Sequence, residues 1–334
     1  MVTPEEVRAL PAAALDTRRR ADSGRPPAPA PEGGSHVAVV VKPEVMTAPH
    51  AAGMLAAAVG ALGRQGVSVL RCAVVPAADF AARGDLLLHY PRLHRVAADG
   101  VAALTSGARG ALDALRDRTG VRDVLPAYVA MAHGDLSPRA LEDRCREAGI
   151  HKLGSGSYAS VTEVGGRPAV VLNGFLPALD QGYRTPDALV GLLECHSGRP
   201  VAELRDEVLG ELHPFRAAPG SLRGTLGALA REHGTVLSEG RNAVHLSAGH
   251  LEGMFQNWRY FAAKDGDGLD RTPLGRTLAR AGVDLEAAAA LATDPGVTDG
   301  TGRTLSPHGA TENLDREEVV RLVAEWTTKR ELAG

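Results

Sequence analysis

An apolar, β-branched run from Val37 to Val41 places the strongest constraint on how this chain folds. The run is too short for a helix and is followed by Pro43, so it predicts a buried strand. Residues 49–65 come next, with apolar side chains at helical spacing, and Gly66 marks the end of the predicted helix. A strand followed by an amphipathic helix predicts a sheet with helices packed on it.

Further strands and helices are predicted as far as residue 209. The remaining predicted elements of this part are strands at 67–75 and 169–172 and helices at 79–90, 185–195 and 201–209. The strand at 169–172 is entered through a predicted β-hairpin at Gly165-Gly166. These elements predict a fold of the α/β (α+β) class.

Changes in composition divide the chain into four expected parts. A Pro/Gly-rich stretch around residues 26–31 cannot bury much surface, and helical patterns at 108–118 and 137–148 interrupt the predicted sheet. An amphipathic pattern at 315–329 predicts a helix that docks on the body. The expected parts are a flexible N-terminal tail (1–35) that begins with a short helix (4–15), a core in two blocks (36–94 and 166–262), an inserted helical subdomain or lid (95–165) and a C-terminal helical extension (263–334).

Composition excludes several classes of function. The 334 residues carry a formal net charge of -3, which gives no basic field for nucleic acid. Three widely spaced cysteines disfavour a disulfide framework and fit a reducing cytosol. Without an apolar run of about 18 residues or a secretory signal, we expect a cytoplasmic protein that does not enter a membrane. Richness in alanine, arginine and glycine is typical of bacterial coding bias.

Four short motifs follow one another in a recognisable order. Lys42-Pro43 ends the first predicted strand, and His89-Tyr90 ends the second predicted helix. Pro219-Gly-Ser-Leu-Arg-Gly224 precedes Asn242-Ala-Val-His-Leu-Ser247. Together they resemble the nucleoside diphosphate kinase family, in which a Pro-Gly-Thr-Ile-Arg-Gly loop precedes Asn-x-x-His-Gly-Ser-Asp. The resemblance spans two separated blocks of the chain.

The resemblance implies a ferredoxin-like antiparallel sheet with flanking helices and a phosphotransferase activity. By resemblance, His245 takes a phosphoryl group from a nucleoside triphosphate such as ATP, which arrives with Mg²⁺. Lys42 and Arg223 would neutralise charge on the phosphate oxygens, while Asn242 and Tyr90 would position the group. We expect no metal ligands from the protein itself.

The chemistry requires these residue types. A phosphohistidine forms from a neutral imidazole, of which one nitrogen attacks and the other is held by an acceptor. A lysine supplies a point charge, and an arginine supplies a fork that matches phosphate oxygens. Each residue taken alone is better explained as structural. It is the joint pattern of His245, Asn242, Arg223, Lys42 and Tyr90 that favours function.

The chain departs from the family pattern at several residues that bind the nucleotide phosphates away from the transferred group or that orient the histidine. Asp206 stands at the arginine position with Arg205 beside it, and Leu212 replaces a threonine. Ala248 replaces the aspartate that follows Ser247, and Gln256 replaces the glutamate that orients the histidine. We expect Arg205, Ser247, Gln256 and Tyr90 to contact the nucleotide. The altered groups predict a specialised nucleotide or small metabolite as acceptor.

Two other functions stay open at this point. His245 can act as a general acid or base on a nucleotide-like phosphorylated substrate without forming a phosphoenzyme. Alternatively, the chain is a non-catalytic module that binds nucleotide. In each case the expected partners are a nucleotide and a small molecule, without nucleic acid, and a homodimer is expected because family members assemble from dimers.

Three further stretches resemble other motifs and are interpreted as structural. Leu153–Val161 is glycine-rich like a kinase loop, but it lacks the third glycine and the downstream lysine, so a hairpin turn is expected. Asp135 and Ser137 before Pro138 are interpreted as the start of a helix. Asp265–Asp270 lacks the closing glutamate of a calcium loop and is interpreted as solvated.

Overall fold

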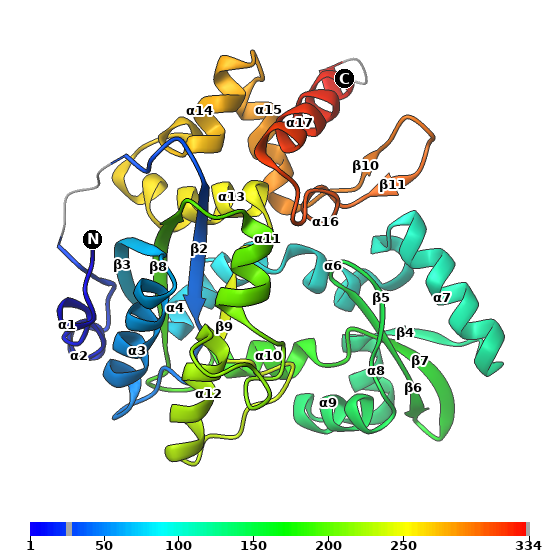
Figure 1. The fold of residues 1–334 in the computed structure, drawn as a ribbon. Helices are drawn as coiled ribbons and strands as arrows, with labels where there is room; N and C mark the ends of the chain where they lie inside the picture. The colour runs from blue at the N-terminus through cyan, green and yellow to red at the C-terminus, as the bar shows by residue number, and fades with distance from the viewer. Residues whose placement is uncertain (25–28, 332–334) are drawn as a thin grey trace. The chain divides into compact units, whose positions relative to one another are not determined.

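The structure, a computed structural model, describes residues 1–24 and 29–331, without the side chains of residues 329–331. It confirms the α+β class, with separate antiparallel and mixed sheets and many helices (Figure 1). The chain divides into two compact units. Unit 1 consists of Met1–Arg83, Tyr183–Ala289 and the residues from Thr311 onward, and unit 2 consists of Gly84–Gly182 and Ala290–Ala310.

Unit 1 is built on a five-stranded sheet in the order β1-β3-β8-β2-β9, and every neighbouring pair is antiparallel. Its strands are β1 (Ala21–Asp22), β2 (Ser35–Val41), β3 (Ser68–Pro76), β8 (Leu189–Ser197) and β9 (Val244–Leu246). Every residue of β2 is buried. This strand therefore lies inside the sheet with both faces covered, as its unbroken apolar run predicts.

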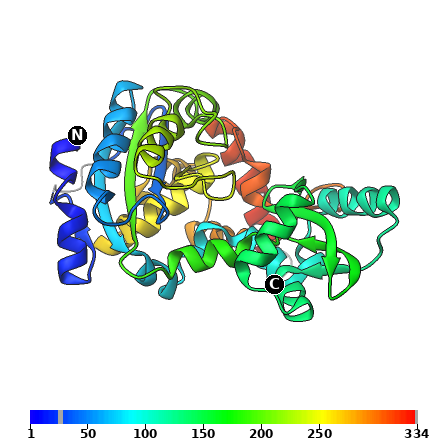
Figure 2. The ribbon, with the colours of Figure 1, turned by 90° about the horizontal axis from the view of Figure 1, so that it is seen from below.

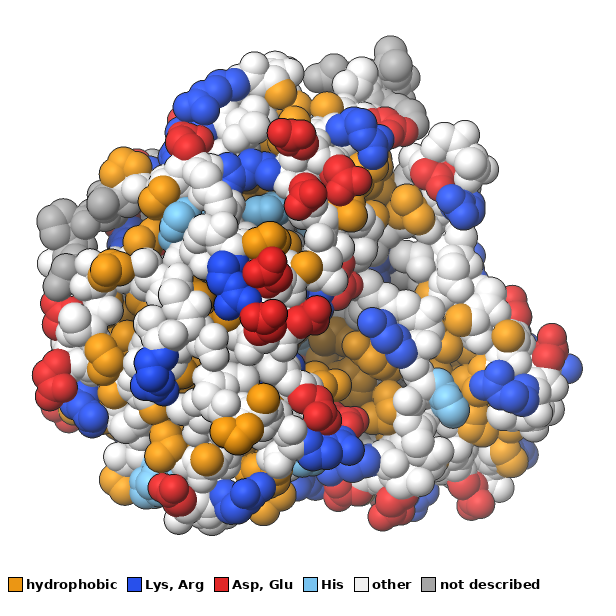
Figure 3. Space-filling model, viewed as in Figure 1, with side chains coloured by type: hydrophobic (Ala, Val, Ile, Leu, Met, Phe, Trp, Pro, Cys, Tyr) orange, Lys and Arg blue, Asp and Glu red, His pale blue; other side chains and the backbone are white. Residues whose placement is uncertain are grey.

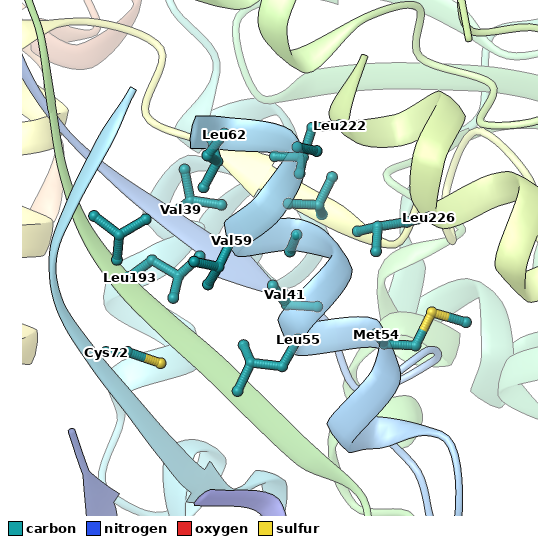
Figure 4. Close-up of a cluster of buried hydrophobic side chains, with 14 of the residues drawn as sticks. Val39, Val41, Met54, Leu55, Val59, Leu62, Cys72, Leu193, Leu222 and Leu226 are labelled. Carbon is teal, nitrogen blue, oxygen red and sulfur yellow. The ribbon is translucent and has the colours of Figure 1, made fainter. Parts of the chain in front are cut away.

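Helices cover both faces of this sheet. On one face lie α3 (Ala51–Arg64) and α12 (Leu222–Glu232), which share an apolar core with alternate residues of β2. Figure 4 shows Leu55, Val59 and Leu62 of α3 between the sheet and Leu226 of α12. Helix α13 (His250–Tyr260) packs against β2 as well. Since Val37, Val39 and Val41 belong to the first core, the side chains of the alternating residues face α13.

The other elements of unit 1 surround this framework. They are α1 (Pro4–Val7), α2 (Leu10–Thr17), α4 (Ala77–Ala82), α11 (Val201–Glu203), a π-helix η2 (Leu204–Leu209), the 3-10 helices η3 (Ala262–Asp265) and η4 (Leu269–Arg271), α14 (Pro273–Arg280), α15 (Leu285–Ala289) and α17 (Arg316–Glu331). The helix predicted at 201–209 is thus present as α11 and η2. The docked C-terminal helix is present as α17, which buries Val319, Val323 and Trp326.

Unit 2 contains a four-stranded mixed sheet in the order β4-β7-β6-β5. Its turns at residues 155–156 and 165–166 are the predicted hairpins. The strands of this sheet are β4 (Val124–Pro126), β5 (His151–Gly154), β6 (Ser157–Val164) and β7 (Arg167–Leu172). Unit 2 also contains a separate two-stranded sheet of β10 (Val297–Thr298) and β11 (Thr304–Leu305). The helices of unit 2 are α5 (Asp85–His89), α6 (Pro91–Asp99), η1 (Gly100–Ala103), α7 (Ser106–Thr119), α8 (Ala127–Gly134), α9 (Pro138–Glu147), α10 (Leu176–Tyr183), η5 (Ala290–Thr293) and α16 (Pro307–Ala310).

Three sequence predictions about these elements are wrong. The helix expected at 185–195 is strand β8, whose apolar residues are buried between β2 and β3 and therefore do not alternate with polar ones. The strand predicted at 169–172 is present as β7, but the resemblance implies that it is the third strand of the core sheet, and this is wrong because β7 belongs to the sheet of unit 2. The single helix expected at 79–90 is α4 and α5, separated at Gly84, whose φ of 76° does not continue a helix.

The first 22 residues of the segment expected to be a flexible tail are ordered, and the helix predicted at 4–15 is present there as α1 and α2. Helix α1 begins at a capping box formed by Thr3 and Glu6, and it packs with α2 against α3. Figure 2 shows these two dark-blue helices beside the light-blue α3. Val7 and Leu10 join the apolar core of α3, which offsets the entropy of ordering this segment. Pro26, Pro27 and Ala28 lie outside the described residues.

The surface carries charges of both signs. On the face drawn in Figure 3, basic and acidic side chains lie next to one another and form no extended field of one sign. Among the described residues, no helix has the length and apolar character needed to cross a membrane.

The packing of α1 leads to a first prediction. Val7 is completely buried, whereas Val236 is 70% exposed. We expect Val7→Ala to lower the free energy of unfolding by roughly 1–3 kcal/mol, because it leaves a small cavity in the core. Val236→Ala is the matched control and should change it by less than about 0.5 kcal/mol. Urea unfolding measures both, and equal stability of the two variants would mean that α1 does not pack on the core.

Candidate functional site

The pairing of β9 with β2 brings two distant segments of the chain together. Val40 lies opposite His245, and Val41 lies opposite Val244. The Lys42 amide then donates a hydrogen bond of 2.8 Å to the Ala243 carbonyl. Because paired residues in an antiparallel ladder share a face, His245 lies on the same face as Val40, the face covered by α13.

Helix α13 supplies the partner of the histidine. His245 Nε2 lies 3.2 Å from Glu252 Oε1. The same carboxylate accepts hydrogen bonds from the Gln256 amide at 2.7 Å and, through Oε2, from the Ala248 backbone amide at 2.6 Å. An ionised carboxylate only accepts, so the proton of the neutral imidazole is directed to Nε2. Glu252 therefore fixes the orientation and the tautomer of His245.

Sequence reasoning missed Glu252 and gave its role to Gln256. The amide nitrogen of Gln256 lies 3.5 Å from His245 Nε2, at the limit of a hydrogen bond, whereas its short contact is with Glu252. The two residues are four positions apart on α13 and thus share one face of the helix. That spacing is the signal that could have identified Glu252.

Ser247 has a structural role in place of the expected contact with nucleotide. Its side chain is completely buried. Its hydroxyl accepts from the Ala38 amide at 2.9 Å and donates to Gln256 Oε1 at 2.7 Å. Ser247 thus joins β2 to the amide that holds Glu252. Gln256 is also buried, so its contacts are with the protein as well.

Lys42 and Asn242 form the second part of the site. Lys42 Nζ donates a 2.7 Å hydrogen bond to Asn242 Oδ1, and Asn242 Nδ2 donates to the Glu239 carbonyl at 2.9 Å. Burial lowers the pKa of the Lys42 ammonium to about 8; the carboxylate of Glu44 opposes this shift, and repulsion from Arg223 adds to it. A bound anion would relieve the repulsion between these two cationic side chains.

Arg223 is positioned by the start of α12. Ser221 caps this helix by accepting from the Gly224 amide at 3.1 Å. Arg223, the second residue of the helix, is mostly buried and donates to the Gly210 carbonyl at 3.0 Å. Its guanidinium adds a full charge to the positive end of the helix dipole. Both features favour a phosphate group.

The turn that precedes His245 is strained. Ala243 has a φ of 68°, in the left-handed region that non-glycine residues seldom adopt. Its amide donates to Glu44 Oε1 at 3.0 Å, and its carbonyl accepts from Lys42. These bonds hold the turn that carries Asn242 toward Lys42, at a cost of about 1–2 kcal/mol.

Arg205 does not stand as an isolated phosphate ligand. It lies in the π-helix η2, and its Nη2 is 2.6 Å from Glu312 Oε1. Its Nη1 donates to Asn313 Oδ1, also at 2.6 Å. The partners of the Arg205 side chain thus lie in the C-terminal part of unit 1.

Tyr90 belongs to unit 2, at the junction of α5 and α6. Its ring packs edge-on against His89, with ring centroids 4.2 Å apart. Its carbonyl accepts from the His94 amide within α6.

Within the described residues, no group of three histidine, cysteine or carboxylate side chains is arranged to hold a metal ion. Comparisons with known proteins find no family model, no curated protein and no solved structure that matches this chain.

The buried lysine leads to a prediction on stability. The folded-state pKa of Lys42, about 8, lies below the ordinary value of 10.5, so the unfolded chain binds this proton more tightly. The ammonium therefore destabilises the fold below pH 8, and the penalty disappears as the pH rises to 10.5. We expect Lys42→Met to be more stable than the natural chain by up to about 3 kcal/mol at pH 7.

Urea unfolding at several pH values measures this difference. The advantage of Lys42→Met should shrink above pH 8. An advantage that stays constant up to pH 10.5 would show that the ammonium is not desolvated.

Proposed function

We propose that this chain is a phosphotransferase in which His245 accepts a phosphoryl group from a magnesium-bound nucleoside triphosphate and passes it to a second substrate. The observation that carries the proposal is the contact of His245 Nε2 with Glu252, on a strand whose pairing with β2 also brings Lys42 to Asn242. A held imidazole and a positioned cation are groups that phosphoryl transfer needs.

In the first step, the attacking atom is His245 Nδ1, the ring nitrogen that Glu252 does not engage. The new N–P bond forms as the bond from the terminal phosphorus to its bridging oxygen breaks, and the nucleoside diphosphate leaves with the electron pair. The ring would become cationic, and the Glu252 carboxylate beside Nε2–H stabilises that charge. In the second step, an acceptor oxygen attacks the phosphorus as the N–P bond breaks, and the electron pair of that bond returns to Nδ1 and restores the neutral ring.

Lys42 and Arg223 act on the oxygens of the group in transit. Asn242 holds the ammonium of Lys42 through its side-chain oxygen, so the charge is oriented before substrate arrives. Such preorganised charges stabilise the transition state without reorganisation during the reaction. In this proposal the magnesium ion is bound by the phosphates of the substrate.

The topology of unit 1 supports the proposed relationship to nucleoside diphosphate kinases. If β2, β3, β8 and β9 are numbered one to four, they stand in the antiparallel order 2-3-1-4. Helix α3 lies between the first two in sequence, and α12 lies between the last two. This is the order of a ferredoxin-like sheet, the fold that the motifs imply. The specialised acceptor inferred from Asp206 and Leu212 remains part of the proposal.

The phosphoenzyme provides the direct test. We expect incubation with ATP and Mg²⁺ to add one acid-labile phosphoryl group to the intact protein, because N–P bonds of histidine hydrolyse in acid. His245→Ala should gain none. Glu252→Gln should be phosphorylated at least roughly 100-fold more slowly, since the neutral amide neither fixes the tautomer nor stabilises the cationic ring. Intact-protein mass measures all three, and unchanged labelling of His245→Ala would place the chemistry elsewhere.

The lysine predicts how nucleotide binding depends on pH. Because the pKa of Lys42 is lowered to about 8, the side chain loses its charge above that pH and attracts phosphate less. We expect the affinity for ATP to fall by up to about tenfold per pH unit above pH 8. Lys42→Arg keeps its charge and should show a flat profile in calorimetry. A flat profile for the natural chain would mean that Lys42 does not contact the nucleotide.

The His245–Glu252 contact favours one second candidate. A histidine held by a carboxylate is also the arrangement of a general acid–base pair, which would act on a phosphorylated, nucleotide-like substrate. ATP binding without a phosphoenzyme would favour this candidate.

A further inference from the structure

A short segment of the C-terminal part of unit 1, Thr311–Asn313, lies against the backbone that follows His245. We call it the C-terminal strap. The Asn313 amide donates a 3.0 Å hydrogen bond to the Ala248 carbonyl. A Cβ atom placed on Gly249 would lie 2.6 Å from the Thr311 carbonyl oxygen, closer than such atoms approach. Gly249 is therefore what allows the two backbones to meet.

The side chain of Arg205 contacts two residues of the strap. Its guanidinium contacts the side-chain oxygens of both Glu312 and Asn313 at 2.6 Å. About a quarter of the Arg205 and Glu312 side chains is exposed, so the ion pair itself adds little to stability. Asn313 adopts a φ of 63°, which asparagine tolerates better than most residues. The fork of Arg205 thus fixes the direction of the strap more than it stabilises the fold.

Ala248 is also linked to His245 through the carboxylate of Glu252. The Ala248 amide donates to Glu252 Oε2 at 2.6 Å, and Glu252 Oε1 lies 3.2 Å from His245 Nε2. The bond to the strap and the bond to the carboxylate thus belong to one residue. A movement of the strap would displace Ala248 and the carboxylate that orients the ring.

We propose that Arg205 and Asn313 are positioning residues that act through Ala248 and Glu252 on His245, and that Arg205 does not bind substrate. The consequence for phosphoryl transfer rests on the function proposed above, whereas the consequence for the imidazole does not. A displacement of about 1 Å at a reacting group costs up to about a hundredfold in rate. A loosened strap should therefore slow phosphorylation of His245 and leave nucleotide affinity unchanged.

The test is an NMR measurement of the His245 tautomer in ¹⁵N-histidine-labelled protein, with the His245 signals assigned by comparison with His245→Gln. The variants are Arg205→Gln and Asn313→Gly, which keeps the left-handed backbone and removes the side-chain oxygen. Arg18→Gln is the matched control, because Arg18 forms an exposed ion pair with Asp187 elsewhere in unit 1. Glu252→Gln supplies the reference for a ring without its carboxylate.

We expect a predominant Nε2–H form in the natural chain and a several-fold larger Nδ1–H fraction in Arg205→Gln and Asn313→Gly. The phosphorylation rate of these variants should fall roughly tenfold with unchanged ATP affinity. Arg18→Gln should match the natural chain in all three. An unchanged tautomer in folded Arg205→Gln and Asn313→Gly overturns the proposal, and so does a loss of ATP affinity in Arg205→Gln.

Salt provides a second measurement that needs no variant to fold. Raising NaCl from about 0.05 M to about 1 M screens a partly exposed ion pair, so the Nδ1–H fraction of His245 in the natural chain should rise. Signals that do not respond to salt overturn the proposal. A tautomer that responds to the strap in a protein that ATP never phosphorylates supports the strap and refutes the proposed phosphotransferase.

Discussion

Three residue pairs between β9 and β2 hold the candidate site together. Lys42 and Asn242 are 200 positions apart in the sequence, and their side chains meet at 2.7 Å because this ladder sets their register. A shift of one residue would turn His245 toward the apolar core under α3 and away from α13. The register in turn depends on the packing of Val39 and Val41 in that core. The chemistry of the site is thus fixed by apolar contacts on the opposite face of the sheet.

Glu252 and Gln256 depend on each other through a hydrogen bond. The Gln256 amide accepts from the Ser247 hydroxyl with its oxygen and donates to Glu252 with its nitrogen. A carboxylate at position 256 could accept from Ser247 but could not donate, and two carboxylates at this distance would repel each other. A glutamine at 256 is therefore what allows the carboxylate to stand one turn earlier on α13. The negative charge that seemed in the sequence to be lost at position 256 is present at position 252.

The sequence allowed prediction of the elements with the clearest periodicity and of the residues in the motifs. Strand β2 and helix α3 follow from local patterns, whereas the grouping of Lys42, Asn242 and His245 follows from the resemblance to nucleoside diphosphate kinases. Strand β8 did not, because a strand covered on both faces lacks the alternation that distinguishes it from a buried helix. The partners of Arg205 lie more than a hundred residues further along the chain, where no local pattern links them to it. The role of Glu252 depends on how α13 lies on the sheet, which composition and spacing do not specify.

The position of unit 2 in the sequence has a consequence for synthesis. Residues 84–182 separate β2 and β3 from β8, the strand that pairs with both of them. While a ribosome is making unit 2, β2 has none of its eventual neighbours, since β8 and β9 have not been translated. A largely apolar strand with two open edges is then exposed to other nascent chains. Unit 2, by contrast, can assemble its four-stranded sheet as soon as it emerges, because those strands are contiguous in sequence. The four-stranded sheet of unit 2 can thus form before the sheet of unit 1, and the nascent chain has reason to need a chaperone at β2.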